Sequence, residues 1–413
     1  MDSASPRASS TRLAALARPS RSRLSARAVG LAVSGVMALS LLGAGAVGAA
    51  GPTRLFVAPG GSDGGPCSRS APCLTIGHAV TVAAPGSTVV VKAGTYHEQV
   101  FVTKQLTLSG EGATIDASGL LGGLPPLDGM GIIGMGMLIA GPGANGSVVQ
   151  GFTVENAPAE GILAAMTSNV TIVRNELLNN DLGGTTAFDP LPFECAAQGE
   201  IPGDCGEALH LLSVTNSRAV GNNVHDNVGG FLLTDEAGPT YGNLVANNVS
   251  RDNKLDCGIT LPSHNGAAVG DPTKGGVYHN TIIGNLSQGN GGAGVGMFAP
   301  FPGTASYDNW VIGNRLLNNG EAGVGIHSHA PGQNVSGNVI VGNSISGNGV
   351  DPDFVDASTT IGIMIGSVAD PVSVTVVGNR IANEDVGIYR SGSIDVHGLH
   401  GNFFASTVVT PIH

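Results

Sequence analysis

Basic and aromatic residues are scarce in this chain of 413 residues, of which only 12% are charged and 4% aromatic. Acidic residues outnumber basic ones by 30 to 18, and the first 50 positions hold six of the basic residues but only one acidic residue. Residues 51–413 therefore carry a net charge near −17. The electric field of this charge repels polyanions, which excludes nucleic acid as a partner. It also disfavours a uronate-rich polymer as a substrate unless divalent cations bridge it to the protein. Neutral glycans fit more easily.

Glycine, in contrast, is abundant, with 65 copies. Each glycine in a helix interior costs roughly 1 kcal/mol relative to alanine, so this composition excludes a mainly helical protein. Many short strands joined by tight turns fit better, and we expect an all-β fold. A chain of this length remains one domain most easily if repeats lengthen a single core.

The amino terminus has the pattern of a secretory signal. Its basic front is followed by an apolar run over residues 28–50, which ends in small residues. We expect a signal peptide at 1–50, with cleavage near Gly51 and a secreted mature chain that has no membrane partner. The alternative is an uncleaved anchor, because the apolar run is long enough to span a bilayer.

Five cysteines in an exported protein predict disulfides. Cys67 and Cys73 lie six residues apart in a Pro/Ser-rich turn, and Cys195 and Cys205 bracket a Pro/Gly-rich loop, so we expect these two pairs. Cys257 is left over. It precedes Gly258 at a place where other repeats carry small residues, which predicts a small buried thiol.

The mature chain divides into three predicted parts. Residues 51–84 contain a short strand and an apolar stretch at helix spacing, which would form a cap over the open end of a repeat array. Residues 85–404 show short strands bounded by Gly, Asp or Ser, and residues 405–413 are expected to be a tail.

Five later segments share one register. Each begins with glycine and continues with alternating apolar residues, and they cover residues 230–236, 258–264, 294–300, 323–329 and 362–368. Alternation predicts that the second and fourth residues point into a core. The seventh places hold Glu236, His264, Pro300, His329 and Val368.

Asparagines recur at the ends of the predicted strands. Asparagine tolerates left-handed backbone, and its amide can bond to the asparagine of the next repeat, so ladders are expected at the corners of stacked coils. The expected ladder residues are Asn175, Asn180, Asn222, Asn227, Asn285, Asn290, Asn314, Asn319, Asn343, Asn348 and Asn379.

These asparagine repeats, together with the motifs at residues 57–63 and 85–96, resemble secreted right-handed parallel β-helix proteins of the pectin-lyase-like superfamily. The resemblance covers nearly all of the mature chain. It implies a single-stranded right-handed parallel β-helix, a solenoid, and it implies a carbohydrate-active role. That fold carries lyases, hydrolases, esterases, epimerases and non-catalytic surface proteins, so the reaction stays open.

In a parallel coil, equivalent residues of neighbouring repeats lie about 4.8 Å apart, so the polar residues of the shared register would form one wall. A carboxylate beside imidazoles can move protons near neutral pH, which predicts cleavage of a polysaccharide by hydrolysis or β-elimination. Hydrolysis would use two carboxylates. The candidate catalytic residues are Asp235, Glu236, His264, His327, His329, His210 and Asp256.

Other interpretations remain open. His327 and His329 with a third group could bind a metal ion, and a divalent cation such as calcium is a possible cofactor. The same wall could instead bind a glycan without turnover. Asp235 could serve only as a turn residue. Lone histidines elsewhere, including His225, are expected to be exposed or capping residues, and the protein is expected to be a monomer.

Overall fold

The computed structural model describes residues 51–120, 134–180, 207–353 and 358–413. The predicted signal peptide and the predicted Cys195–Cys205 pair lie outside the described residues. Within the described ranges, no helix is long and apolar enough to cross a membrane.

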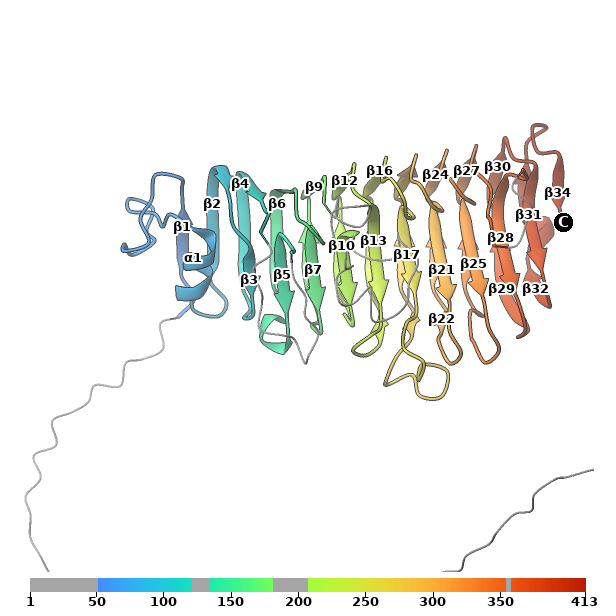
Figure 1. Ribbon diagram of the computed structural model, residues 1–413, viewed down its shortest axis with the longest axis horizontal. Coiled ribbons are helices and arrows are strands. Elements are labelled where there is room, and N and C mark those ends of the chain that lie inside the picture. The colour runs from blue at the N-terminus through green and yellow to red at the C-terminus, as the bar shows by residue number, and fades with distance from the viewer. Residues whose placement is uncertain (1–50, 121–133, 181–206, 354–357) are drawn as a thin grey trace, which may run out of the picture. The chain divides into compact units, whose positions relative to one another are not determined.

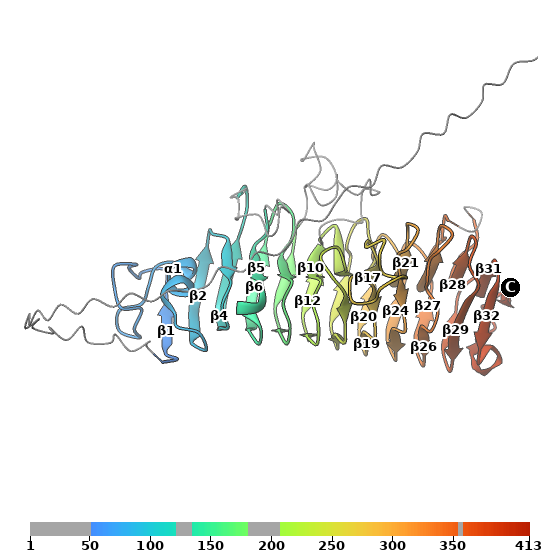
Figure 2. The same ribbon diagram turned by 90° about the horizontal axis from the view of Figure 1, so that it is seen from below.

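Parallel strands dominate the described part of the chain and wind into a β-helix, which confirms the predicted fold class. Figures 1 and 2 show its coils following one another in chain order from β1 to β34. A 20-stranded sheet, called sheet A here, contains the following strands: β1 (Arg54–Val57), β2 (Thr88–Tyr96), β4 (Thr107–Asp116), β6 (Val148–Glu155), β8 (Thr171–Val173), β9 (Glu176–Leu178), β11 (Arg218–Val220), β12 (Asn223–His225), β15 (Leu244–Ala246), β16 (Val249–Arg251), β19 (Thr281–Ile283), β20 (Leu286–Gln288), β23 (Trp310–Ile312), β24 (Arg315–Leu317), β26 (Val339–Val341), β27 (Ser344–Ser346), β29 (Val372–Val377), β30 (Arg380–Ala382), β32 (Ile394–His397) and β33 (Phe403–Phe404).

Two further sheets complete the coils. Sheet B has 11 strands: β3 (Val100–Val102), β5 (Met137–Ala140), β7 (Ile162–Ala165), β10 (Glu207–Leu212), β13 (Gly229–Thr234), β17 (Ile259–Pro262), β21 (Val295–Ala299), β25 (Val324–Ser328), β28 (Ile361–Ser367), β31 (Val386–Ser391) and β34 (Thr410–Ile412). Sheet C has three strands: β14 (Thr240–Tyr241), β18 (Val277–Tyr278) and β22 (Ser306–Tyr307). Sheet C extends the parallel backbone pairing between neighbouring coils.

The five repeated segments lie in sheet B in the predicted register. Phe231 pairs with Ile259, and Leu261 pairs with Met297 and through it with Ile326. All five side chains are buried in one continuous hydrophobic core. The alternation of apolar residues therefore determined which face of sheet B points inward.

The glycine that opens each repeated segment has a steric cause. A Cβ atom built on Gly230 would lie 2.1 Å from the carbonyl oxygen of Gly258, and one on Gly294 would lie 2.6 Å from that of Gly323. Real side chains do not approach backbone so closely. Glycine is thus required where the chain of one coil enters sheet B against the next coil.

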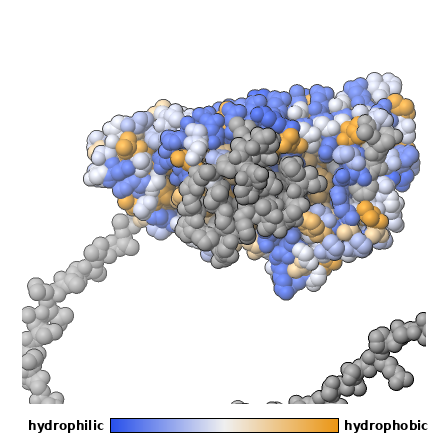
Figure 3. Space-filling view, in the orientation of Figure 1, coloured by the Kyte–Doolittle hydropathy of each residue, from blue (hydrophilic) through white to orange (hydrophobic). Residues whose placement is uncertain are grey.

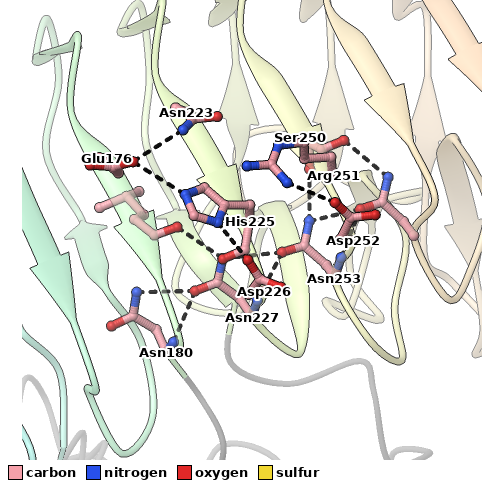
Figure 4. A network of polar contacts seen from close by, with 12 residues as sticks. Glu176, Asn180, Asn223, His225, Asp226, Asn227, Ser250, Arg251, Asp252 and Asn253 are labelled. Carbon is pink, nitrogen blue, oxygen red and sulfur yellow. Dashed lines mark hydrogen bonds and ion pairs between the residues drawn. The ribbon is translucent and has the colours of Figure 1, made fainter.

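Asparagine ladders form the corners, as expected. In Figure 4 the side chains of Asn180, Asn227 and Asn253 follow one another across three coils. The Nδ2 of Asn180 donates to Oδ1 of Asn227 at 3.1 Å, and the Nδ2 of Asn227 donates to Oδ1 of Asn253 at 3.1 Å. Each ladder residue follows a residue in the left-handed region, such as Asn179 with φ 53°. A third ladder, which the repeat pattern did not reveal, joins Asn243, Asn280, Asn309 and Asn338.

The first coil carries the predicted cap. Helix α1 (Ile76–Val82) begins after Thr75, whose side chain accepts from the backbone N–H of His78. The Cys67–Cys73 disulfide is confirmed. The described ranges also contain two short 3-10 helices, η1 (Pro142–Ala144) and η3 (Leu399–Gly401).

The carboxy-terminal segment is not a separate tail. Thr410 and Ile412 of β34 pair with Val386 and Ile388 of β31, so the segment 405–413 adds one more strand to sheet B. The exposed backbone edge of β31 explains this pairing, because its N–H and C=O groups offer a template for a further strand.

Candidate functional site

The predicted contact between Glu236 and His264 forms on the outer face of sheet B. Glu236 follows β13 and His264 follows β17, the next strand of the sheet. The Oε1 of Glu236 lies 2.7 Å from Nδ1 of His264. Burial alone would raise the pKa of Glu236, but the hydrogen bond with His264 and the charges of His264 and His210 outweigh it and lower this pKa to about 2. Glu236 is therefore a carboxylate across the physiological range.

A second imidazole–carboxylate pair lies beside the first. The Nδ1 of His210 is 2.7 Å from Oε1 of Glu160, and its Nε2 is 2.7 Å from Oγ1 of Thr234. Burial would lower the pKa of His210, but the charge and hydrogen bond of Glu160 raise it. Thr234 and the charge of His210 both help to lower the pKa of Glu236. The Glu160–His210–Thr234 group and the Glu236–His264 pair are thus neighbours on consecutive strands of sheet B.

Asp235 is an anchor for neighbouring backbone rather than an available acid or base. Its side chain is fully buried and accepts from Ser263 Oγ at 2.8 Å, from the N–H of His264 at 2.6 Å, and from the N–H of Gly276. Burial and the charge of Glu236 raise its pKa against these hydrogen bonds. The turn-residue interpretation of Asp235 therefore describes its contacts best, since all of them position the segment that follows β17.

Asp256 belongs to another part of the sheet. It precedes β17, whereas His264 follows this strand, so the two residues lie at opposite ends of it. Asp256 accepts from Thr260 Oγ1 at 3.0 Å and shares a hydrogen bond with Glu207. Burial raises its pKa. The structure thus does not bring Asp256 to the Glu236–His264 pair.

His327 and His329 form a separate cluster with two aspartates. The Nε2 of His327 lies 2.8 Å from Oδ2 of Asp351, and its Nδ1 lies 3.2 Å from Oδ2 of Asp353. The Nε2 of His329 lies 3.5 Å from the same Asp353 oxygen. Burial would lower the pKa of His327, but the two aspartates raise it to about 9. The pKa of His329 is lowered by burial and by the charge of His327.

The acidic residues that contact these histidines were not predicted from the sequence. Glu160 precedes β7, and Asp351 and Asp353 lie between β27 and β28, outside the shared register. Nothing in the repeat pattern pointed to Glu160. The Asp-Pro-Asp sequence after Val350 places two carboxylates two residues apart, which matches the spacing of His327 and His329 and could have indicated a paired site.

His225, which was expected to be an exposed or capping residue, is buried. Figure 4 shows it between Glu176 and Asp226, on sheet A rather than on sheet B. Its Nδ1 is 2.7 Å from Asp226 and its Nε2 is 3.3 Å from Glu176. A histidine–carboxylate contact therefore also occurs away from the candidate wall. Cys257 is a free, buried thiol, as predicted.

The described surface in Figure 3 is largely hydrophilic, with small hydrophobic spots. Most candidate side chains, however, are well covered. His264 is 2% exposed, Glu236 13% and His327 3%, while His329 is 35% exposed. The wall is therefore a set of enclosed polar clusters, and His329 is the most accessible of these four.

Two family models match this chain. One, described as "Periplasmic copper-binding protein (NosD)", matches residues 194–410, and one described as "Protein of unknown function (DUF1565)" matches residues 59–290. No curated protein matches.

Solved β-helix structures are similar in fold at low sequence identity. The mannuronan C-5 epimerase AlgE4 A-module of Azotobacter vinelandii is 15% identical with a TM-score of 0.49, over 79% of this chain and 89% of that one. Pectate lyase Pel9A is 15% identical with a TM-score of 0.47, over 86% of this chain and 79% of that one. The adhesin PfbA of Streptococcus pneumoniae is 15% identical with a TM-score of 0.48, over 79% and 90%.

Proposed function

This chain belongs to the NosD and DUF1565 families of parallel β-helix proteins, and we propose that it is an exported protein acting on a carbohydrate polymer along the outer face of sheet B. In this proposal His264 transfers a proton to or from the glycan, and Glu236 orients its imidazole. The observation that carries the proposal is the 2.7 Å contact between Glu236 Oε1 and His264 Nδ1.

The chemistry of this pair suits proton transfer. An ionised carboxylate on one ring nitrogen fixes the tautomer of an imidazole and stabilises its protonated form, so the other nitrogen can exchange a proton. The lowered pKa of Glu236 keeps that carboxylate charged at neutral pH. His210, which contacts Glu160, also lies 2.7 Å from Oγ1 of Thr234, two residues before Glu236, and so supports the end of β13 from which the carboxylate extends.

The contacts favour elimination over hydrolysis by two carboxylates. Hydrolysis of that kind needs a protonated carboxylic acid facing a second carboxylate across the sugar. Glu236 is ionised, and Asp256 lies at the other end of β17. The carboxylate of Asp235 already accepts hydrogen bonds from backbone N–H groups and from the Ser263 hydroxyl. A single imidazole base is sufficient to abstract a proton next to a carboxyl group. The substrate would then be a uronate polymer, with a divalent cation offsetting the negative charge of the protein.

An extended substrate suits the geometry of the fold. Neighbouring strands of sheet B repeat at about 4.8 Å, so polar groups recur in one direction along the array. Glu236 and His264 follow strands of this sheet, and His327 and His329 lie at the end of another of its strands. A polymer lying along the array could contact more than one coil.

A substrate panel tests this proposal. The mature chain is incubated with neutral and uronate polymers, with and without calcium, while absorbance of unsaturated sugars and new reducing ends are recorded. Loss of general acid–base catalysis typically costs 10²–10⁴-fold, so we expect His264→Ala and Glu236→Gln to lower turnover by about that factor. His225→Gln is the matched control, because it changes a similar imidazole–carboxylate pair on sheet A. Equal turnover by wild type and both site variants would contradict the proposal.

A non-catalytic glycan-binding module is the second candidate function. The observation that favours it is the low exposure of His264, of which only 2% of the side chain is accessible. Glycan binding that is weakened by Glu236→Gln, without any new reducing ends or unsaturated products, would support this candidate instead of catalysis.

A further inference from the structure

We propose that His327, His329 and Asp353 form a binding site for a divalent transition-metal ion such as Zn²⁺ or Cu²⁺. This site is distinct from the Glu236–His264 pair, and the inference does not depend on glycan turnover. Three residues of suitable chemistry converge here, with one possible ligand atom from each within 4.8 Å of the others.

The spacing of the donor atoms fits tetrahedral coordination. Metal–ligand distances of about 2.0–2.1 Å at tetrahedral angles separate two ligand atoms by about 3.4 Å. The Oδ2 of Asp353 lies 3.2 Å from Nδ1 of His327 and 3.5 Å from Nε2 of His329. Both separations match this edge length, so an ion could bind with small movements of the side chains.

The fold holds the two imidazoles on one side of the chain. His327 lies in β25 and His329 follows it directly, so side chains two residues apart point to the same face. Their ring centroids lie 5.5 Å apart, and the ring of Phe298 on the neighbouring strand lies 5.1 Å from that of His327. Packing on the next coil therefore restricts the orientation of the first ligand.

Asp351 contacts the ring nitrogen of His327 that would not bind the metal, and metal-binding histidines commonly have such a carboxylate contact. Its Oδ2 lies 2.8 Å from Nε2 of His327, the ring nitrogen that faces away from Asp353, and its side chain is 1% exposed. A carboxylate in this position orients the imidazole and increases its basicity as a ligand. Asp351 is thus a positioning residue, and His327, His329 and Asp353 are the ligands.

The donor set favours a transition metal over calcium. Calcium takes six to eight oxygen ligands, whereas two imidazoles and one carboxylate suit Zn²⁺ or Cu²⁺. The calcium considered on sequence grounds therefore does not fit this cluster. The other described group with possible ligands contains Cys67, Cys73 and His78, but its two sulfurs are joined in the disulfide.

Metal titration of the mature chain, without an affinity tag and after chelator treatment, tests the site. Calorimetry with Zn²⁺ is expected to show one tight site per chain. His329→Ala and Asp353→Ala each remove an accessible ligand and should weaken that site at least tenfold. Asp351→Asn should weaken it about 10–100-fold through His327. With Cu²⁺, electron paramagnetic resonance should show nitrogen from two imidazoles in wild type and from one in His329→Ala.

His279→Ala is the matched control, because His279 lies 3.6 Å from Asp308 in an exposed pair that belongs to neither group of three possible ligands among the described residues. Its affinity for Zn²⁺ should equal that of wild type. Circular dichroism of each variant verifies that the fold is intact. The proposal is overturned if the chain binds no Zn²⁺ or Cu²⁺, or if affinity and stoichiometry are the same in wild type, His329→Ala and Asp353→Ala.

Discussion

Glu236 and His264 are 28 residues apart in sequence, yet Oε1 of the first lies 2.7 Å from Nδ1 of the second. The contact exists because β13 and β17 are neighbouring strands in register, with Phe231 paired to Ile259 and Leu232 to Thr260. Strands β14, β15 and β16 lie between them in the chain, so the contact joins equivalent places on consecutive coils.

Replacing Glu236 should change how stability depends on pH. Its pKa in the folded protein is about 2, below the ordinary value of 4.5, so its ionised form stabilises the fold above about pH 4.5. This contribution is lost as pH falls towards 2. Glu236→Gln should lower the free energy of unfolding at pH 7 by roughly 1.5–3 kcal/mol, typical of a charged hydrogen bond, and by less at pH 3. Denaturant unfolding at both pH values measures this, and an equal deficit at both would contradict it.

Glu384 should have the opposite pH dependence. It occupies the last place of an asparagine ladder, and its Oε1 accepts from the N–H of Asn348 at 3.0 Å and from Nδ2 at 3.1 Å. Burial raises its pKa to about 7. The folded state therefore holds a proton that the unfolded state has lost between pH 4.5 and 7, and stability decreases as pH rises through this window.

Glu384→Gln should remove that decrease while keeping the acceptor oxygen. We expect wild type and variant to have similar unfolding free energies at pH 5, and the variant to be more stable at pH 8 by up to roughly 3 kcal/mol. Chemical denaturation across this range measures the effect. A variant that is less stable than wild type at pH 8 would show that ionisation of Glu384 does not lower the free energy of unfolding.

Two adjacent asparagines allow a controlled test of a ladder. Asn319 is buried, and its Oδ1 accepts from Nδ2 of Asn290 at 2.9 Å while its Nδ2 donates to Asn348 Oδ1 at 2.9 Å. Asn319→Ala leaves buried partners unsatisfied and should cost about 2–4 kcal/mol of unfolding free energy. Asn318 is exposed with φ 53°, so Asn318→Gly keeps its backbone conformation and should change stability by far less. Equal losses in the two variants would contradict a specific role of the ladder.

The glycines that open the repeated segments of sheet B should not tolerate replacement by alanine. In Gly294→Ala the new Cβ would meet the carbonyl oxygen of Gly323 at 2.6 Å, and we expect a loss of roughly 1–3 kcal/mol from overpacking. Gly64 is exposed and its nearest neighbouring atom to a Cβ is 3.8 Å away, so Gly64→Ala is the control. Thermal melting compares them, and unchanged melting of Gly294→Ala would refute the steric explanation.

Periodicity predicted a repeating fold of short strands, the inward residues of sheet B and most of two asparagine ladders, whereas the resemblance to a known superfamily implied the parallel β-helix. These features repeat with the coil, and backbone hydrogen bonds between neighbouring coils hold equivalent residues in register. For the same reason the Glu236–His264 contact could be predicted, since both residues follow equivalent strand positions.

Only the tertiary structure decided what surrounds each polar side chain. Loops of different lengths bring Asp353 to His329 and bring the backbone of Gly276 to Asp235, and no period in the sequence specifies such contacts. Through these contacts Asp235 positions neighbouring backbone, and His329 lies next to a carboxylate. The repeating strands fix the positions of the backbone from which the side chains extend, because their hydrogen bonding is regular. The segments between strands determine which polar groups come into contact, because these segments differ in length and conformation from one coil to the next.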